Sequence, residues 1–166
     1  MSSAAPPGIW AVVPVKPLSK AKSRLASVLD TASRAQLVVA MLRHTLGVLT
    51  ATDGLTGISV ISADRRIEEI ARMYGAFFLT EPCAGGLNAA LERAAASLET
   101  RGAEGLLVVP GDLPRLSRES IESALSLLSV PGMVIAPDRR ERGTNLLLLA
   151  PPNLLRPRSG TNTGID

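Results

Sequence analysis

The stretch "IWAVVPVKPLSKAKSRL", Ile9 to Leu25, joins a continuous apolar run to a loop dense in positive charge. Its first seven residues are apolar and include several β-branched side chains, which predicts a buried β-strand over residues 9–15. The Lys/Pro/Ser-rich segment that follows marks the end of that strand. A strand without polar alternation is typical of a parallel sheet that helices cover on both faces.

The same alternation of strand and helix continues along the chain. Helical spacing and continuous apolar runs predict helices over 34–50, 63–74, 87–100 and 117–128, and further strands over 57–62, 76–80, 105–110, 132–137 and 144–150. This order indicates an α/β fold, a three-layer α/β/α domain around a mostly parallel sheet. We assign residues 1–150 to that domain and residues 151–166 to a C-terminal tail.

Composition narrows the functional class. Aromatic residues make up only 2% of the 166 residues, and the basic excess lies mainly in the first loop, with six basic and one acidic side chain in residues 1–50. A nucleic-acid binder usually spreads its basic residues over a stripe or a helix face, so we expect no nucleic-acid partner. One cysteine, no signal-peptide pattern and no membrane-length apolar run predict a soluble, cytoplasmic protein without a membrane partner.

The carboxyl ends of parallel strands meet at one edge of a sheet, where ligands bind. The first loop there carries Lys16, Lys20, Lys22 and Arg24. One interpretation is a solvated basic surface loop. The other is a triphosphate site, because lysine offers a compact charge and arginine a bidentate fork to phosphate oxygens. The loop has neither the P-loop nor the dinucleotide-binding glycine pattern.

An aspartate follows another predicted strand, in "PGDLPRL", Pro110 to Leu116. Asp112 stands between two prolines, which stiffen its surroundings. An aspartate in this position often serves only a turn or a helix start. The functional hypothesis is a Mg²⁺ ligand, because this hard cation takes a carboxylate together with substrate phosphates.

Two further loops carry candidate binding residues. In "CAGGLNAAL", Cys83 to Leu91, Gly86 permits close backbone approach and Asn88 offers both a donor and an acceptor to a base or ribose. In "DRRERGTNLLLL", Thr144 and Asn145 follow a basic loop and favour a second phosphate pocket. Either segment can equally be an ordinary loop beside a helix or strand.

Together, the four segments resemble the 2-phospho-L-lactate guanylyltransferases and the similar phosphoenolpyruvate guanylyltransferases of coenzyme F-420 biosynthesis. The resemblance runs in order from about Trp10 to Ala150. It implies a nucleotide-diphospho-sugar-transferase-like fold and a Mg²⁺-dependent enzyme. That enzyme would join GMP from GTP to a phosphorylated three-carbon acid and release pyrophosphate.

Matched residues carry the family's roles onto this chain. The resemblance places Lys16, Lys20, Lys22 and Arg24 on the GTP phosphates, with Lys22, Arg24 and Asp112 catalytic. It places Gly86 and Asn88 on the nucleoside, Asp112 on the metal, and Thr144, beside Asn145, against the phospho-acid. The chemistry agrees, because an ionised phosphate ester needs no general base and charge neutralisation is the main catalytic requirement.

The tail from residue 151 departs from the family pattern and is divergent or truncated, which leaves two alternatives. One is another nucleotidyltransferase, acting on a sugar phosphate or molybdopterin. The other is a nucleotide-binding protein with impaired catalysis. The residues alone leave open the choice of acid, the choice of guanine over adenine, and the oligomeric state.

Overall fold

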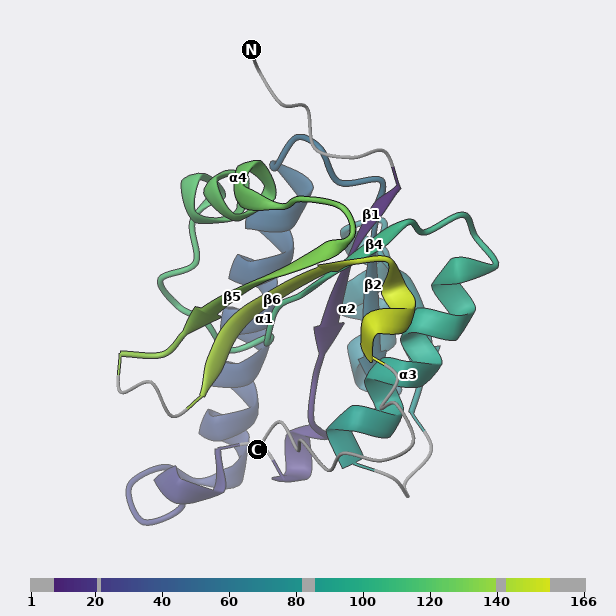
Figure 1. Cartoon of the computed structure of the whole chain (residues 1–166). Coiled ribbons are helices and arrows are strands. Elements are labelled where there is room, and N and C mark those ends of the chain that lie inside the picture. Colours follow the sequence, from purple (N-terminus) through teal and green to yellow (C-terminus); the bar gives the residue numbers. More distant parts are fainter. Residues whose placement is uncertain (1–7, 21, 82–85, 140–142, 156–166) are drawn as a thin grey trace.

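The computed structural model describes residues 8–20, 22–81, 86–139 and 143–155 (Figure 1). Strands and α-helices alternate along most of this length, with short 3-10 turns (η) near both ends. The elements are β1 (Ile9–Pro14), η1 (Leu18–Lys20), η2 (Ser23–Leu25), α1 (Thr31–Thr50), β2 (Gly57–Ser62), α2 (Arg66–Met73), β3 (Phe77–Thr80), α3 (Gly86–Glu99), β4 (Gly105–Val108), α4 (Arg118–Leu127), β5 (Gly132–Pro137), β6 (Thr144–Ala150) and η3 (Pro152–Leu155).

The strands form one sheet in the order β3-β2-β1-β4-β6-β5. The pairs β3–β2, β2–β1 and β1–β4 are parallel, whereas β6 runs antiparallel to both β4 and β5. The chain moves outward from β1 to β3 and then returns to place β4 on the other side of β1. The strand order therefore reverses at β1 and β4, and this reversal defines the switch point of the sheet.

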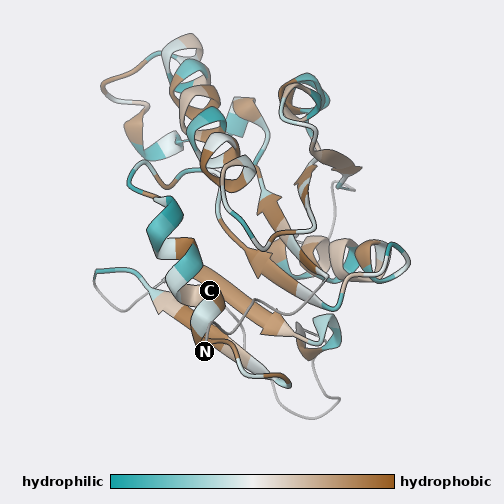
Figure 2. Cartoon of the chain, turned by 90° about the horizontal axis from the view of Figure 1, so that it is seen from above, coloured by the Kyte–Doolittle hydropathy of each residue, from teal (hydrophilic) through white to brown (hydrophobic). Residues whose placement is uncertain are grey.

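Two apolar cores lie between the sheet and the helices, one on each face of the sheet. Along β1, alternate residues such as Ala11 and Val13 join the core beneath α1, α2 and α4, whereas Val12 joins the core beneath α3. Seen from above, the apolar strands lie between the helices (Figure 2). The mostly parallel α/β sheet predicted from the sequence is thus confirmed, and both faces of its central strands are buried because helices cover them.

The predicted helices and strands are all present, with small shifts at their ends. Helix α1 begins at Thr31, three residues before the expected start, because Asp30 caps it by accepting a hydrogen bond from Ser33 N at 2.6 Å. Ser117 caps α4 in the same way, by accepting a hydrogen bond from Ser120 N. Strand β4 ends at Val108, two residues before Pro110.

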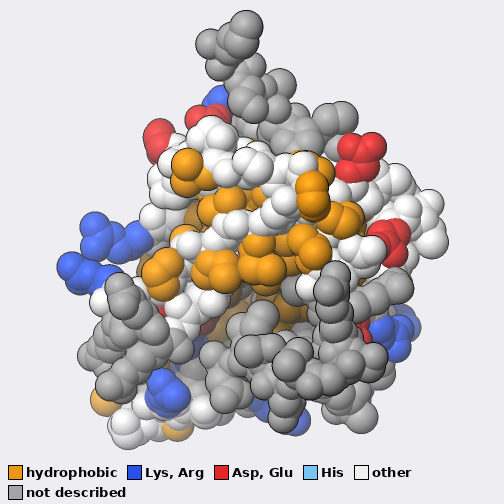
Figure 3. All heavy atoms as spheres, viewed as in Figure 1, with side chains coloured by type: hydrophobic (Ala, Val, Ile, Leu, Met, Phe, Trp, Pro, Cys, Tyr) orange, Lys and Arg blue, Asp and Glu red, His pale blue; other side chains and the backbone are white. Residues whose placement is uncertain are grey.

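Helical cover does not extend across the whole sheet. Met133 and Ile135 project from β5 and remain exposed, beside Leu149 and Leu147 of β6 in register. Hydrophobic side chains accordingly gather over these two strands in the space-filling view (Figure 3). None of the described helices is long and apolar enough to cross a membrane.

Candidate active site

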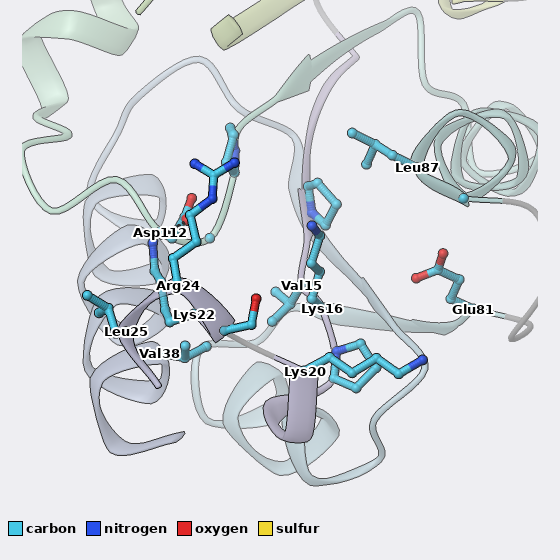
Figure 4. Close-up of a pocket in the computed structure, with 16 residues that line it drawn as sticks. Val15, Lys16, Lys20, Lys22, Arg24, Leu25, Val38, Glu81, Leu87 and Asp112 are labelled. Atoms are coloured by element: carbon cyan, nitrogen blue, oxygen red, sulfur yellow. Dashed lines mark hydrogen bonds and ion pairs between the residues drawn. The ribbon is translucent and has the colours of Figure 1, made fainter. Parts of the chain in front are cut away.

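The segments after β1, β3 and β4 open onto one cavity of about 730 Å³ at the carboxyl edge of the sheet (Figure 4). This volume lies within the range of roughly 300–1,000 Å³ that small-molecule sites occupy. The cavity adjoins the switch point between β1 and β4, the usual ligand position in such sheets. Its lining consists of Pro14, Val15, Lys16, Pro17, Lys20, Lys22, Ser23, Arg24, Leu25, Val38, Glu81, Gly86, Leu87, Pro110, Gly111 and Asp112.

The basic loop is fixed at its start by the neighbouring strand. Val15 N donates to Ile61 O at 2.9 Å, which continues the pairing of β1 with β2 beyond the end of the strand. Leu18 is buried, and its backbone N–H donates to Asp64 Oδ2 at 3.0 Å. Lys16 lines the cavity just before η1, and the turns η1 and η2 bring Lys20, Lys22 and Arg24 to the same wall.

Lys22 forms the direct link between two of the predicted site segments. Its Nζ lies 2.7 Å from Asp112 Oδ2, and the two side chains remain 30% and 48% exposed. The Lys22 backbone has a φ of 51°. Among the described residues, Lys22 is the one non-glycine residue with a positive φ. That conformation is uncommon for a residue with a Cβ, and it lets the Lys22 side chain reach Asp112 from the start of η2.

The turn that carries Asp112 packs closely against β1. A Cβ on Gly111 would meet Val15 Cγ2 at 3.2 Å, so a larger residue would require Val15 to shift by a few tenths of an ångström. Further along the turn, the Leu116 carbonyl lies 3.0 Å from His44 Nε2 on α1. His44, which is itself exposed, therefore links α1 to this turn.

Asp64, which follows β2, was not among the residues predicted from sequence. Its side chain is 8% exposed, accepts the Leu18 N–H, and pairs with Arg66 at 2.7 Å. The hydrogen bond from Arg66 and the Leu18 N–H outweigh burial and lower the pKa of Asp64 to about 2. The available signals were its place after a buried strand, shared with Asp112, and the arginine pair Arg65–Arg66 that follows it.

Glu81 and Leu87 line the cavity on the side away from Asp112. Glu81 directly follows β3, and its N–H donates to Ser62 O at 2.9 Å, which anchors it to the sheet. Leu87 lies in the first turn of α3 and is 49% exposed, next to Gly86, whose φ is +69°. In Figure 4, Glu81 and Leu87 lie on one side, Lys22, Arg24 and Asp112 on the other, and Lys16 between them.

The remaining predicted binding residues lie outside the cavity lining. Asn88 is exposed in the first turn of α3. Thr144 begins β6 at the same carboxyl edge, and Asn145 Nδ2 donates to Pro137 O at 3.4 Å. The roles assigned to these three residues stay predictions. Cys83, most of the basic segment before Gly143, and residues 156–166 of the tail lie outside the described residues.

Asp112 is the residue best suited to a metal among the predicted site residues. Its carboxylate is partly exposed within the cavity and faces cationic side chains that suit phosphate oxygens. One carboxylate combined with substrate phosphates is a usual donor set for Mg²⁺, so the residues present fit this ion. Among the described residues, no three His, Cys, Asp or Glu side chains gather as a metal cluster.

Comparison with known proteins agrees with the observed fold, and the family match makes the chain a nucleotidyltransferase. A proposed nucleotide-diphospho-sugar transferase of Desulfovibrio desulfuricans G20 superposes with a TM-score of 0.74 at 16% identity, covering 95% of this chain and 71% of that one. At this identity the likeness supports the fold alone.

The family follows from sequence similarity. A family described as CofC-like guanylyl transferase matches residues 9–161, and the chain belongs to it. The phosphoenolpyruvate guanylyltransferase of Sphaerobacter thermophilus is 38% identical over 92% of this chain and 73% of its own length. That of Rubrobacter xylanophilus is 43% identical over 89% and 71%, respectively. The family resemblance noted in the sequence is thereby confirmed.

Proposed function

We propose that this protein transfers GMP from GTP to phosphoenolpyruvate and releases pyrophosphate. Its family membership and its relatives' names support the reaction class and the acid. The observation that carries the proposal is the 2.7 Å pair between Lys22 and Asp112 inside a cavity that also holds Lys16, Lys20 and Arg24. Coenzyme F-420 biosynthesis is the pathway that the family resemblance implies for the product.

The reaction needs charge neutralisation more than proton transfer. A phosphate oxygen of phosphoenolpyruvate attacks the α-phosphorus of GTP, a new P–O bond forms, and the bond to the bridging α,β-oxygen breaks as pyrophosphate leaves. The attacking phosphate is already ionised, so no general base is required. The obstacle is repulsion between two anions, which positioned lysines and arginines reduce.

Each cation has a place in this scheme. Lys16, Lys20, Lys22 and Arg24 bind and orient the triphosphate, and Lys22 and Arg24 lie nearest the side where Asp112 is found (Figure 4). Asp112 would hold Mg²⁺ together with phosphate oxygens, and the ion supplies further neutralisation of the developing charge. The Lys22–Asp112 pair keeps both charged groups at the cavity before the nucleotide binds.

Pyrophosphate release tests this function. The protein is incubated with GTP, Mg²⁺ and either phosphoenolpyruvate, 2-phospho-L-lactate or a sugar phosphate, and the guanylylated product is identified by mass spectrometry. We expect turnover with phosphoenolpyruvate and a loss of about a hundredfold or more in Asp112→Asn, as for removal of a charge-stabilising group. Glu104→Gln is the control, because Glu104 is exposed beside the amino end of β4, at the opposite edge of the sheet.

Absence of pyrophosphate release with either phospho-acid contradicts the proposed function. Release with the sugar phosphate alone would assign the chain to a different reaction on the same fold. Equal rates for the wild type and Asp112→Asn would remove the assigned role of this carboxylate.

A further inference from the structure

The cavity contains a carboxylate that the proposed reaction does not use. Glu81 lines a site whose other charged side chains are four cations and Asp112. The negative charge of Glu81 repels phosphate groups. The Glu81 carboxylate therefore suits a different part of the ligand, one that donates hydrogen bonds. Among the described residues, the structure records no hydrogen bond or ion pair to the Glu81 side chain, which leaves both carboxylate oxygens available to a ligand.

Glu81 lies too far along the sheet to share a metal with Asp112. It follows β3, whereas Asp112 lies in the turn after β4, and the strand order places β2 and β1 between them. With strands about 4.8 Å apart, three spacings separate these strand ends by roughly 14 Å. That distance is comparable with the reach from the phosphates to the base of an extended nucleotide. Glu81 therefore stands where the base belongs if the phosphates lie at Lys22 and Asp112.

Leu87 gives this end of the cavity the apolar surface that a base requires. Its side chain is about half exposed and shares this side of the cavity with Glu81 (Figure 4). The position of Glu81 is also well defined, because its backbone continues the pairing of β3 with β2. An apolar side chain can contact the face of a base while a fixed carboxylate accepts hydrogen bonds from its edge. Such a combination can distinguish one base from another.

We propose that Glu81 selects guanine by accepting hydrogen bonds from the N1–H and the 2-amino group of the base. This inference rests on the proposed function. These two donors point the same way and match the two oxygens of an ionised carboxylate. Adenine presents an acceptor beside its amine, cytosine does the same, and uracil presents one N–H between two carbonyls. Glu81 thus favours GTP over ATP, CTP and UTP.

Replacing the Glu81 carboxylate by an amide tests this inference, because it should switch the preferred nucleotide from GTP to XTP. In Glu81→Gln, the amide oxygen still accepts from N1–H, but its NH₂ group now suits the 2-oxo group of xanthine. We expect the wild type to bind GTP about tenfold or more tightly than XTP, with ITP intermediate because it lacks the 2-amino group. Glu81→Gln should reverse the preference between GTP and XTP by a similar factor, measured by calorimetric titration with each triphosphate and Mg²⁺.

Matched variants separate this effect from loss of charge or of folding. Glu104→Gln carries the same chemical change at the opposite edge of the sheet and should keep the wild-type preference. Glu81→Asp keeps the charge on a shorter side chain, and should reduce the preference for GTP over ITP without gaining affinity for XTP. If Glu81→Gln does not fold, the GTP-to-ITP ratio of Glu81→Asp decides the question.

The binding measurements also separate this inference from the proposed function. A preference reversed in Glu81→Gln, with no pyrophosphate release by the wild type, upholds the base-reading role and rejects the reaction. An unchanged GTP-to-XTP ratio in Glu81→Gln overturns the role of Glu81, even where GMP transfer occurs normally. Absence of GTP binding by the wild type overturns both.

Discussion

Lys22 combines three properties that a surface lysine rarely shares. Its backbone is left-handed, with a φ of 51°, its Nζ contacts Asp112, and its side chain lines the cavity. Glycine would suit this backbone better, at a saving of roughly 1–2 kcal/mol in conformational strain. A partly exposed ion pair contributes only about 0–1 kcal/mol. The pair therefore does not offset the strain, which is consistent with the phosphate-binding role proposed for this lysine.

Substitution of Lys22 by alanine and by glycine separates these effects. Both variants remove the charge, so both should bind GTP about tenfold or more weakly than the wild type, the usual effect of losing one charge-assisted hydrogen bond. The free energy of unfolding of the glycine variant should be about 1 kcal/mol higher than that of the alanine variant, because glycine relieves the left-handed strain. Calorimetry measures the affinities and urea titration the stabilities. Wild-type GTP affinity in Lys22→Gly would contradict the phosphate-binding role.

The elements position the site by joining loops from adjacent strands. Asp64 follows β2, yet its carboxylate accepts the N–H of Leu18 in η1. It therefore connects the carboxyl end of β2 to the start of the basic loop after β1. Arg66, on the first turn of α2, holds the carboxylate in its ionised form and is the main cause of its lowered pKa. The position of the cations thus depends on a residue outside the cavity.

Asp64→Asn tests this connection and its dependence on pH. The pKa of Asp64 is lowered to about 2, so its stabilising effect is fully present above about pH 4 and is lost as the pH falls toward 2. At pH 7, we expect the variant to lose up to about 2 kcal/mol of unfolding free energy and to bind GTP more weakly. Urea titrations between pH 7 and pH 3 should show the difference from the wild type shrinking at the acid end.

Asp53→Asn is the matched control for this experiment. Asp53 is 90% exposed and pairs with Arg118 on the surface, so its loss should change the unfolding free energy by less than about 1 kcal/mol. A stability difference for Asp64→Asn that stays constant down to pH 3, or GTP binding equal to the wild type, would contradict the positioning role of Asp64.

At the scale of the whole molecule, the order of strands decides which loops meet. Periodicity along the chain predicted the helices, the strands and the edge that carries the site, because each depends on local apolar spacing. The composition of the loops after the strands, together with the family resemblance, identified the four cations and Asp112, which the fold brings to one cavity. The chain order alone does not say that β2 lies between β1 and β3, with β4 beyond β1. Asp64 and Glu81 each follow a strand, which the sequence indicates, but what their side chains lie beside depends on that arrangement.

Local backbone geometry was also beyond prediction. The sequence "LSKAKSRL" carries no glycine to announce the left-handed residue at Lys22, and two 3-10 turns replace the simple loop expected there. Thr144, in contrast, was predicted as a site residue but does not line the cavity. Family resemblance placed it against the acid substrate, and the structure places it at the correct edge of the sheet without bringing it into the described cavity.

The effect of Mg²⁺ on GTP affinity tests most directly whether the basic loop and Asp112 together bind a metal-bound triphosphate. Calorimetric titrations of the wild type and Asp112→Asn, with and without Mg²⁺, give four affinities. We predict that Mg²⁺ strengthens GTP binding to the wild type about tenfold or more, and that Asp112→Asn loses most of this gain. Without metal, the variant should bind GTP at least as tightly as the wild type, because Lys22 is released from its pair. An undiminished Mg²⁺ effect in Asp112→Asn would contradict the assignment.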